Sequence, residues 1–102
     1  MTVESRTSGD TLYIYLNGEL DEYTARGVRE RTDKLLEAHA GCTRAVFDLS
    51  GVKFMDSAGI GFLLGRYKVL KKNAAAMYLQ GTDFAADKIL SVSGIYSIIP
   101  KL

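Results

Sequence analysis

The segment Phe54-Met55-Asp56-Ser57-Ala58-Gly59-Ile60-Gly61 brings a serine hydroxyl to the point where a loop is predicted to become a helix. The first turn of a helix has free N–H groups and the positive end of the helix dipole, so a phosphate group on Ser57 would be locally well tolerated. Serine and aspartate are also favoured N-cap residues. The spacing alone therefore leaves two interpretations of Ser57 open, a phosphoacceptor and an ordinary helix cap.

Other chemistries fit the same residues less well. An esterase would use Ser57 as its nucleophile, but Met55 stands where a nucleophile elbow needs glycine, and the one histidine, His39, precedes the serine. Asp48 and Asp56 could bind Mg²⁺, yet two carboxylates without a third ligand are a weak metal site. Asp56 is better explained as a helix cap or as a group that orients the Ser57 hydroxyl. We therefore expect no catalytic residue, metal or cofactor.

Composition limits the classes of protein further. The 102 residues are 47% apolar and 25% charged, which describes one domain over 1–102 with a single core. The net charge of +1 is scattered along the chain, so nucleic acid is an unexpected partner. The N-terminus lacks the regions of a signal peptide, and no apolar run approaches the roughly 18 residues of a spanning helix. We expect a cytoplasmic protein without a membrane partner. Cys42 is the only cysteine and forms no intramolecular disulfide.

Hydrophobic periodicity predicts the first elements. Leu12, Ile14 and Leu16 alternate with tyrosines in a strand, which a weaker strand over 2–7 joins in a hairpin. A helix follows, with Asp21 as a possible cap and Gly41 as a possible end. Its inward face carries Ala25, Val28, Thr32, Leu35, Leu36 and His39. Residues 44–49 predict a buried strand, followed by a loop over 50–56 and a second helix. The inward face of that helix carries Ile60, Leu63, Leu64, Tyr67 and Leu70.

The last third of the chain continues the alternation. Residues 77–79 predict a short strand, Thr82 or Asp83 caps a third helix that runs to about residue 92, and Ile98-Ile99 predicts an edge strand. The order β-β-α-β-α-β-α-β indicates an α/β fold, with a mixed sheet, an opening hairpin and helices packed on the sheet. Functional groups of such sheets tend to lie beyond the carboxyl ends of the strands, where residues 50–57 are expected.

The second predicted helix contains three glycines, although a glycine inside a helix costs about 0.5 to 1 kcal/mol relative to alanine. Close packing of the helix on the sheet is one explanation, and close approach of a partner or a phosphate is the other. Gly59, Gly61 and Gly65 do not have the spacing of a dinucleotide site, and no phosphate-binding loop is present.

Several blocks of sequence, in order along nearly the whole chain, strongly resemble the sporulation anti-sigma factor antagonists, which are stand-alone bacterial STAS domains. The blocks are Gly18-Glu19-Leu20-Asp21 with Thr24-Ala25, Asp56-Ser57-x-Gly59-x-Gly61 preceded by Phe54-Met55, Leu64-Gly65-Arg66-Tyr67-Lys68, and Ser93-Gly94 before Ile98-Ile99. The resemblance implies a single STAS-like domain and favours the phosphoacceptor interpretation of Ser57.

The resemblance also implies a regulatory switch without catalysis of its own. The unmodified form of such a protein binds an anti-sigma factor that is also a serine kinase, and so releases a sporulation-type sigma factor. The kinase then phosphorylates the serine that corresponds to Ser57, and a metal-dependent phosphatase of the PPM type restores the free form. Asp56, Gly59 and Gly61 correspond to the surrounding recognition loop. Gly18, Glu19, Leu20 and Asp21 match a block that is expected to contribute to the partner surface, although turn and capping roles would also explain them.

Two features depart from the family pattern. Many relatives have a second serine where this chain has Ala58, and many continue into another C-terminal helix where this chain stops at Leu102. The second departure is expected to affect protection of the sheet edge more than the Ser57 switch. Two other functions stay open: a STAS-like module that binds a nucleotide or anion noncovalently at the same helix start, and a scaffold domain of a stress-signalling complex.

Overall fold

Four strands form one sheet in chain order, β1-β2-β3-β4, in the computed structural model, which describes residues 1–102. β1 (Thr2–Ser8) pairs antiparallel with β2 (Thr11–Leu20) across a turn in which Gly9 has a φ of +59°. β3 (Arg44–Met55) runs parallel to β2, and β4 (Ala76–Gln80) runs parallel to β3. The predicted hairpin and the mixed sheet are therefore confirmed.

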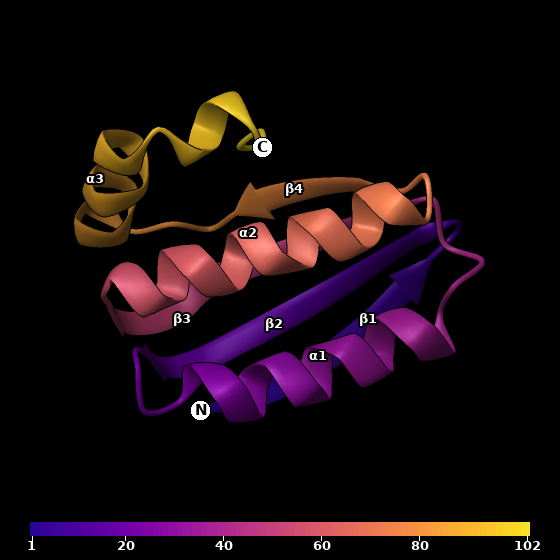
Figure 1. Cartoon of the computed structure of the whole chain (residues 1–102), viewed down its shortest axis with the longest axis horizontal. Coiled ribbons are helices and arrows are strands. Elements are labelled where there is room, and N and C mark those ends of the chain that lie inside the picture. Colours follow the sequence, from indigo (N-terminus) through magenta and orange to yellow (C-terminus); the bar gives the residue numbers. More distant parts are fainter.

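Helices connect the parallel strands and cover one face of the sheet. α1 (Ala25–Ala38) leads from β2 to β3, α2 (Ser57–Lys72) leads from β3 to β4, and the two lie side by side (Figure 1). α3 (Phe84–Ser93) follows β4 and lies at one end of the molecule, and a 3₁₀ turn (Ile95–Ser97) leads the chain back beside β4. None of the helices combines the length and the apolar character that crossing a bilayer would require.

The core lies between the sheet and α1 and α2. The alternating residues of β2 predicted to be apolar are buried, and the strand register places Ile14 beside Phe47 and Phe47 beside Leu79. Val28 and Leu63 are fully buried on the facing helices. On the opposite face Tyr13, Val46 and Tyr78 form one row, which explains why both faces of β2 look apolar in the sequence. The α/β class follows from this layering.

Two predicted boundaries were wrong. β3 continues to Met55 and so takes up all but the last residue of the segment 50–56 that was predicted as a loop, because Glu19 and Leu20 pair with Phe54 and Met55. Asp21 does not cap α1 directly, since the helix begins at Ala25. The helix ends at Ala38, three residues before Gly41, which was the predicted end. The longer β3 carries the chain directly into α2.

The predicted edge strand at Ile98-Ile99 was also wrong. Ile95–Ser97 form a 3₁₀ turn, Ile98 has helical backbone angles, and the side chain of Ile99 is fully buried in the core. Only the last residues reach the sheet edge. The carbonyl of Pro100 accepts a hydrogen bond from the N–H of Leu79 (3.0 Å), and the N–H of Leu102 donates one to the carbonyl of Leu79 (2.8 Å). Only Ile99 of the pair is buried, whereas Ile98 is exposed, and two adjacent apolar residues do not distinguish such a packed turn from a strand.

Candidate functional site

Ser57 is the first residue of α2, and its hydroxyl has no hydrogen-bond partner within the chain. The N-cap is Asp56, whose Oδ1 accepts a hydrogen bond from the N–H of Ala58 (2.9 Å) and whose carbonyl accepts one from Gly59 (3.0 Å). Ser57 is exposed to solvent. Asp56, and not Ser57, therefore caps α2, which agrees with the capping role predicted for Asp56. Capping no longer explains why a serine stands at position 57.

Asp56 also connects the start of α2 to the turn between β2 and α1. Its Oδ2 accepts a hydrogen bond from the N–H of Glu22 (3.4 Å), and its own N–H donates to the carbonyl of Leu20 (3.4 Å). That turn is closed by Asp21, whose Oδ1 accepts from the N–H groups of Tyr23 (2.9 Å) and Thr24 (3.1 Å). The two predicted blocks, 18–21 and 56–61, therefore meet at the carboxyl edge of the sheet.

Gly59 is buried and lies where α2 crosses the end of β2. A Cβ at this position would come within 2.5 Å of Cγ of Met55 and 2.9 Å of the carbonyl oxygen of Leu20. Gly61, two residues further along, is exposed and has open space in the direction of its missing side chain. Close packing therefore explains Gly59, whereas it does not explain Gly61.

Two of the predicted partner-binding positions face the interior. Leu20 is fully buried in the core, and Gly59 is buried beneath it, so neither is accessible to a partner in this structure. Gly18 has a φ of +120° at an irregularity of the β2–β3 register and packs against Met1, which supports a backbone role. Glu19, Asp21, Asp56, Ser57 and Gly61 stay at least partly exposed.

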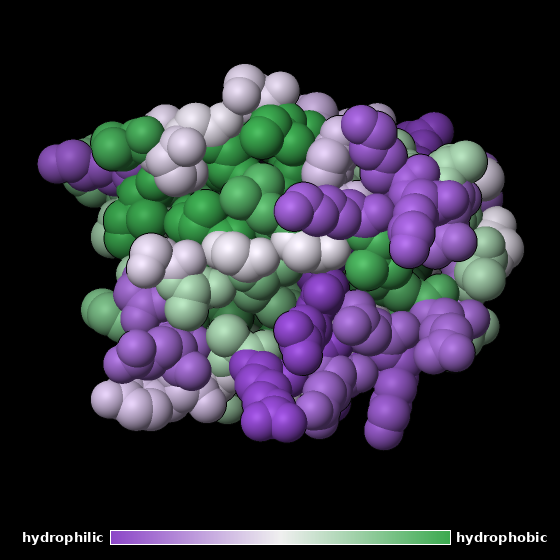
Figure 2. All heavy atoms as spheres, in the orientation of Figure 1, coloured by the Kyte–Doolittle hydropathy of each residue, from purple (hydrophilic) through white to green (hydrophobic).

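Two exposed aromatic residues border this edge and were missed by sequence reasoning. The side chain of Tyr23 is 86% exposed in the turn after β2, and that of Phe54 is 55% exposed three residues before Ser57. Figure 2 shows apolar surface gathered at the end of the molecule where α3 and the start of α2 lie. An apolar residue that breaks the alternation next to the Asp-Ser pair was the available signal for Phe54. Exposed aromatic side chains are typical anchors of protein interfaces.

Comparison with known proteins identifies the family. The family model for the STAS domain matches residues 2–102. The chain belongs to the STAS domain family. An anti-sigma F factor antagonist of Paenibacillus polymyxa is 31% identical over 100 residues, which cover 98% of this chain and 85% of that protein.

Solved structures show that the fold of this STAS domain is shared. An anti-sigma factor antagonist from Mycobacterium paratuberculosis superposes with a TM-score of 0.86 at 21% identity, covering 98% of this chain and 83% of that one. The phosphorylated form of SpoIIAA from Bacillus superposes with a TM-score of 0.71 at 24% identity, covering 99% and 91%. At these identities the likeness establishes the common architecture.

The carboxylate of Asp48, considered above as a metal ligand, is engaged inside the STAS domain. Its Oδ1 accepts hydrogen bonds from the N–H (2.9 Å) and hydroxyl (2.6 Å) of Ser50, and its Oδ2 accepts one from Gln80 (2.9 Å). Burial acts to raise the pKa of Asp48, but these hydrogen bonds prevail and hold it below its ordinary value. No three metal-ligating side chains come together in the domain. Asp48 thus ties β3 to β4.

A second carboxylate, Asp87 on α3, secures the C-terminal segment of the STAS domain. Its Oδ1 accepts hydrogen bonds from Nζ of Lys101 (2.8 Å), the hydroxyl of Tyr96 (2.7 Å) and the hydroxyl of Thr82 (3.3 Å). The hydrogen bond from Lys101, followed by that from Tyr96, holds the pKa of Asp87 below its ordinary value. Burial, and then the contact with Asp87, raises the pKa of Tyr96. This cluster fastens the 3₁₀ turn and the last residues to α3.

Proposed function

We propose that this STAS domain is an anti-sigma factor antagonist controlled by phosphorylation of Ser57. In its unphosphorylated form it binds an anti-sigma factor that is also a serine kinase and thereby frees a sigma factor. Phosphorylation by that kinase ends the binding, and a PPM-type serine phosphatase restores it. The domain acts in the cytoplasm by protein contacts alone, without catalysing a reaction and without binding nucleic acid or membrane.

The observation that carries this proposal is the unused hydroxyl of Ser57. A serine at a helix start is ordinarily explained by capping, but Asp56 performs that role and leaves Ser57 exposed and without a partner. A kinase can therefore reach the hydroxyl without disturbing the helix. The curated relative from Paenibacillus polymyxa is an anti-sigma F factor antagonist, and SpoIIAA has been solved in a phosphorylated form, which supports this assignment.

The surroundings of Ser57 explain how a phosphate would act as a switch. Phosphorylation adds about 1.5 to 2 negative charges at neutral pH. The sequence predicted free N–H groups at this helix start that would favour a phosphate, but the N–H groups of Ala58, Gly59 and Ile60 already donate to Asp56. The carboxylate of Asp56 lies on the adjacent residue, and repulsion adds to the cost of desolvating the phosphate in an interface. A loss of about 1.4 kcal/mol already weakens binding tenfold.

The same geometry disfavours noncovalent anion binding at this helix start. An anion there would compete with the carboxylate of Asp56 for the N–H of Ala58, which lies 2.9 Å from Oδ1. Aspartate at the cap thus occupies the site that an external phosphate would need.

The direct experiment incubates the protein with a candidate anti-sigma kinase from the same genome and ATP, and maps phosphate by mass spectrometry. We expect one phosphate on Ser57 in the wild-type protein and in Ser91→Ala, a control at an exposed serine of α3, and none in Ser57→Ala. Kinase binding is then measured by calorimetry. Ser57→Ala should bind like the unmodified protein, and the phosphorylated protein should bind at least tenfold more weakly.

Two outcomes would contradict the proposal. One is equally tight binding of the phosphorylated and unmodified forms, since the switch would then lack its free-energy difference. The other is an absence of phosphate on Ser57 with a kinase shown to be active on its own substrate.

A further inference from the structure

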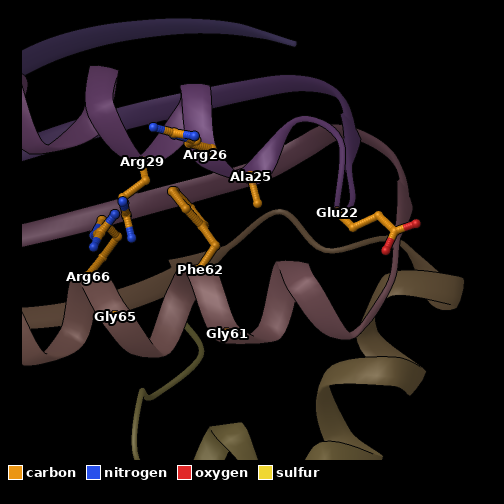
Figure 3. Close-up of a pocket in the computed structure, with 8 residues that line it drawn as sticks. All are labelled: Glu22, Ala25, Arg26, Arg29, Gly61, Phe62, Gly65 and Arg66. Atoms are coloured by element: carbon orange, nitrogen blue, oxygen red, sulfur yellow. The ribbon is translucent and has the colours of Figure 1, made fainter.

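A groove of about 520 Å³ lies between α1 and α2. Arg29 lines it from α1, while Phe62, Gly65 and Arg66 line it from α2. Figure 3 shows the side chains of Arg29 and Arg66 reaching toward each other from the two helices, and Glu22 at the far end of the groove. Two guanidinium groups of like charge thus meet in one recess.

Arg66 is the unusual residue of this groove, because its side chain is only 6% exposed. Its Nε lies 3.1 Å from Oδ1 of Asp33, which is an ion-pair distance, but the two atoms lack the alignment of a hydrogen bond. Its Nη1 is buried and has no hydrogen-bond partner at all. Its guanidinium lies over the ring of Phe62, 5.5 Å from the centroid. A buried cation with free donors is costly unless something pairs with it.

The charges around Arg66 do not balance locally. Burial lowers the pKa of Arg66, Asp33 acts against this effect, and Arg29 lowers it further. Arg29 is exposed and has no ion-pair partner, whereas Arg26 on the same helix is 3.8 Å from Glu30. Asp33 is thus the one carboxylate paired with either of the two guanidinium groups that meet in the groove.

The wall of the groove on α2 is open. Gly61 and Gly65 lie one turn apart, and a Cβ on either would meet no atom within 4 Å. Each glycine costs about 0.5 to 1 kcal/mol of helix stability relative to alanine, and the packing that justifies Gly59 is missing at both. The missing side chains leave backbone exposed beside the two arginines, which is the arrangement that lets a ligand approach closely.

We propose that the α1–α2 groove binds the phosphate or carboxylate group of a small molecule, held between the guanidinium groups of Arg29 and Arg66. The planar guanidinium is matched to both oxyanions, because its parallel N–H donors bind two oxygens at once. The buried Nη1 of Arg66 supplies a donor that no protein group satisfies, and Arg29 supplies the second charge from the facing helix. Neither Ser57 nor Asp56 lines this groove.

The test uses NMR titration of the whole chain with inorganic phosphate, and with malonate as a dicarboxylate, against sodium chloride at equal ionic strength. We expect saturable shifts of the Arg66 Nε–H signal and of the Gly61 and Gly65 amides with at least one of the two oxyanions, and none with chloride. Binding of both indicates a general oxyanion site, and binding of one identifies the preferred group.

Variants separate the site from a general charge effect. Arg29→Gln removes an exposed, unpaired cation and should keep the fold, yet weaken oxyanion binding at least tenfold. Arg44→Gln makes the same change at the start of β3, outside the groove, and should leave binding unchanged. Arg66→Lys keeps the charge but loses the parallel N–H donors of the guanidinium, and it should also weaken oxyanion binding. The proposal is overturned if neither oxyanion gives saturable shifts. It is also overturned if Arg29→Gln and Arg44→Gln weaken oxyanion binding equally.

Discussion

The backbone N–H of Glu22 points at Oδ2 of Asp56 over 3.4 Å, across 34 positions of sequence. Oδ1 of the same carboxylate caps α2 through Ala58. One side chain therefore holds both the loop that follows β2 and the helix that carries Ser57. The arrangement of the candidate partner surface therefore depends on this aspartate.

Replacing Asp56 by alanine should therefore reduce both stability and function. Loss of an N-cap costs about 0.5 to 2 kcal/mol, and the released loop should slow phosphorylation of Ser57 by the kinase. Urea unfolding and the initial rate of phosphate incorporation measure the two effects. Asp83→Ala is the matched control, since Asp83 caps α3 in the same way with a hydrogen bond of 2.8 Å from Ala86. It should lose similar stability but keep the phosphorylation rate; an equal slowing would show that only global stability matters.

Gly59 and Gly61 should respond in opposite directions to alanine. A methyl group on Gly59 would collide with Met55 and with the carbonyl of Leu20, and such overpacking costs about 1 to 3 kcal/mol. A methyl group on Gly61 meets nothing, so the better helix propensity of alanine should stabilise the domain by about 0.5 to 1 kcal/mol. Thermal unfolding of both variants measures the difference. A stable Gly59→Ala protein would mean that α2 moves away from the sheet easily.

The Asp87 cluster should make stability depend on acid pH. Because the folded state lowers the pKa of Asp87, the unfolded chain binds that proton more readily. The stabilisation is therefore complete above the ordinary pKa of aspartate and is lost as the pH falls through the lower folded value. Asp87→Asn should melt below the wild-type protein at neutral pH, and the gap should close in acid. Glu37→Gln, at an exposed position of α1, should show no such gap. A gap that stayed constant at every pH would assign the effect to packing.

The exposed aromatics at the carboxyl edge should contribute to kinase binding if the proposed function holds. Tyr23→Ala and Phe54→Ala each remove a large exposed side chain, and truncation of an interface anchor typically costs about 2 kcal/mol or more. Calorimetry should therefore show at least tenfold weaker binding with little change in melting temperature. Leu102→Ala is the control, because this side chain is 64% exposed at the edge beyond β4. Equal affinities of all three variants would move the interface elsewhere.

The elements that a local period defines were predictable. Alternation in β2 and the apolar stripe of α1 follow directly from side-chain geometry, and Val28, Thr32 and Leu36 are buried as expected. The end of β3 was not predictable, because its pairing with Glu19 and Leu20 depends on two register shifts at which β3 has one more residue than β2. A register shift between two strands cannot be read from the local sequence of either strand.

The capping role of Asp56 was foreseen as one of two roles for this residue, but its contact with the turn after β2 and the burial of Arg66 were not. An arginine in a helix is ordinarily assigned to the solvent face. Arg66 is buried here because α1 covers it and because Asp33 on α1 pairs with its guanidinium group. The spacing from Phe62, with which it shares a helix face, was the one available signal.

The agreement between strand order and chain order has a kinetic consequence. Every strand pairs with the strand made just before it, joined by a tight turn or a single helix, so each new pairing closes only a short loop. Each pairing therefore costs less loop-closure entropy than pairing with a strand further along the chain would. On the ribosome, the sheet can therefore grow strand by strand as β1 through β4 emerge, and only the outer edge of β4 waits for a later segment, the C-terminal residues that pair with Leu79.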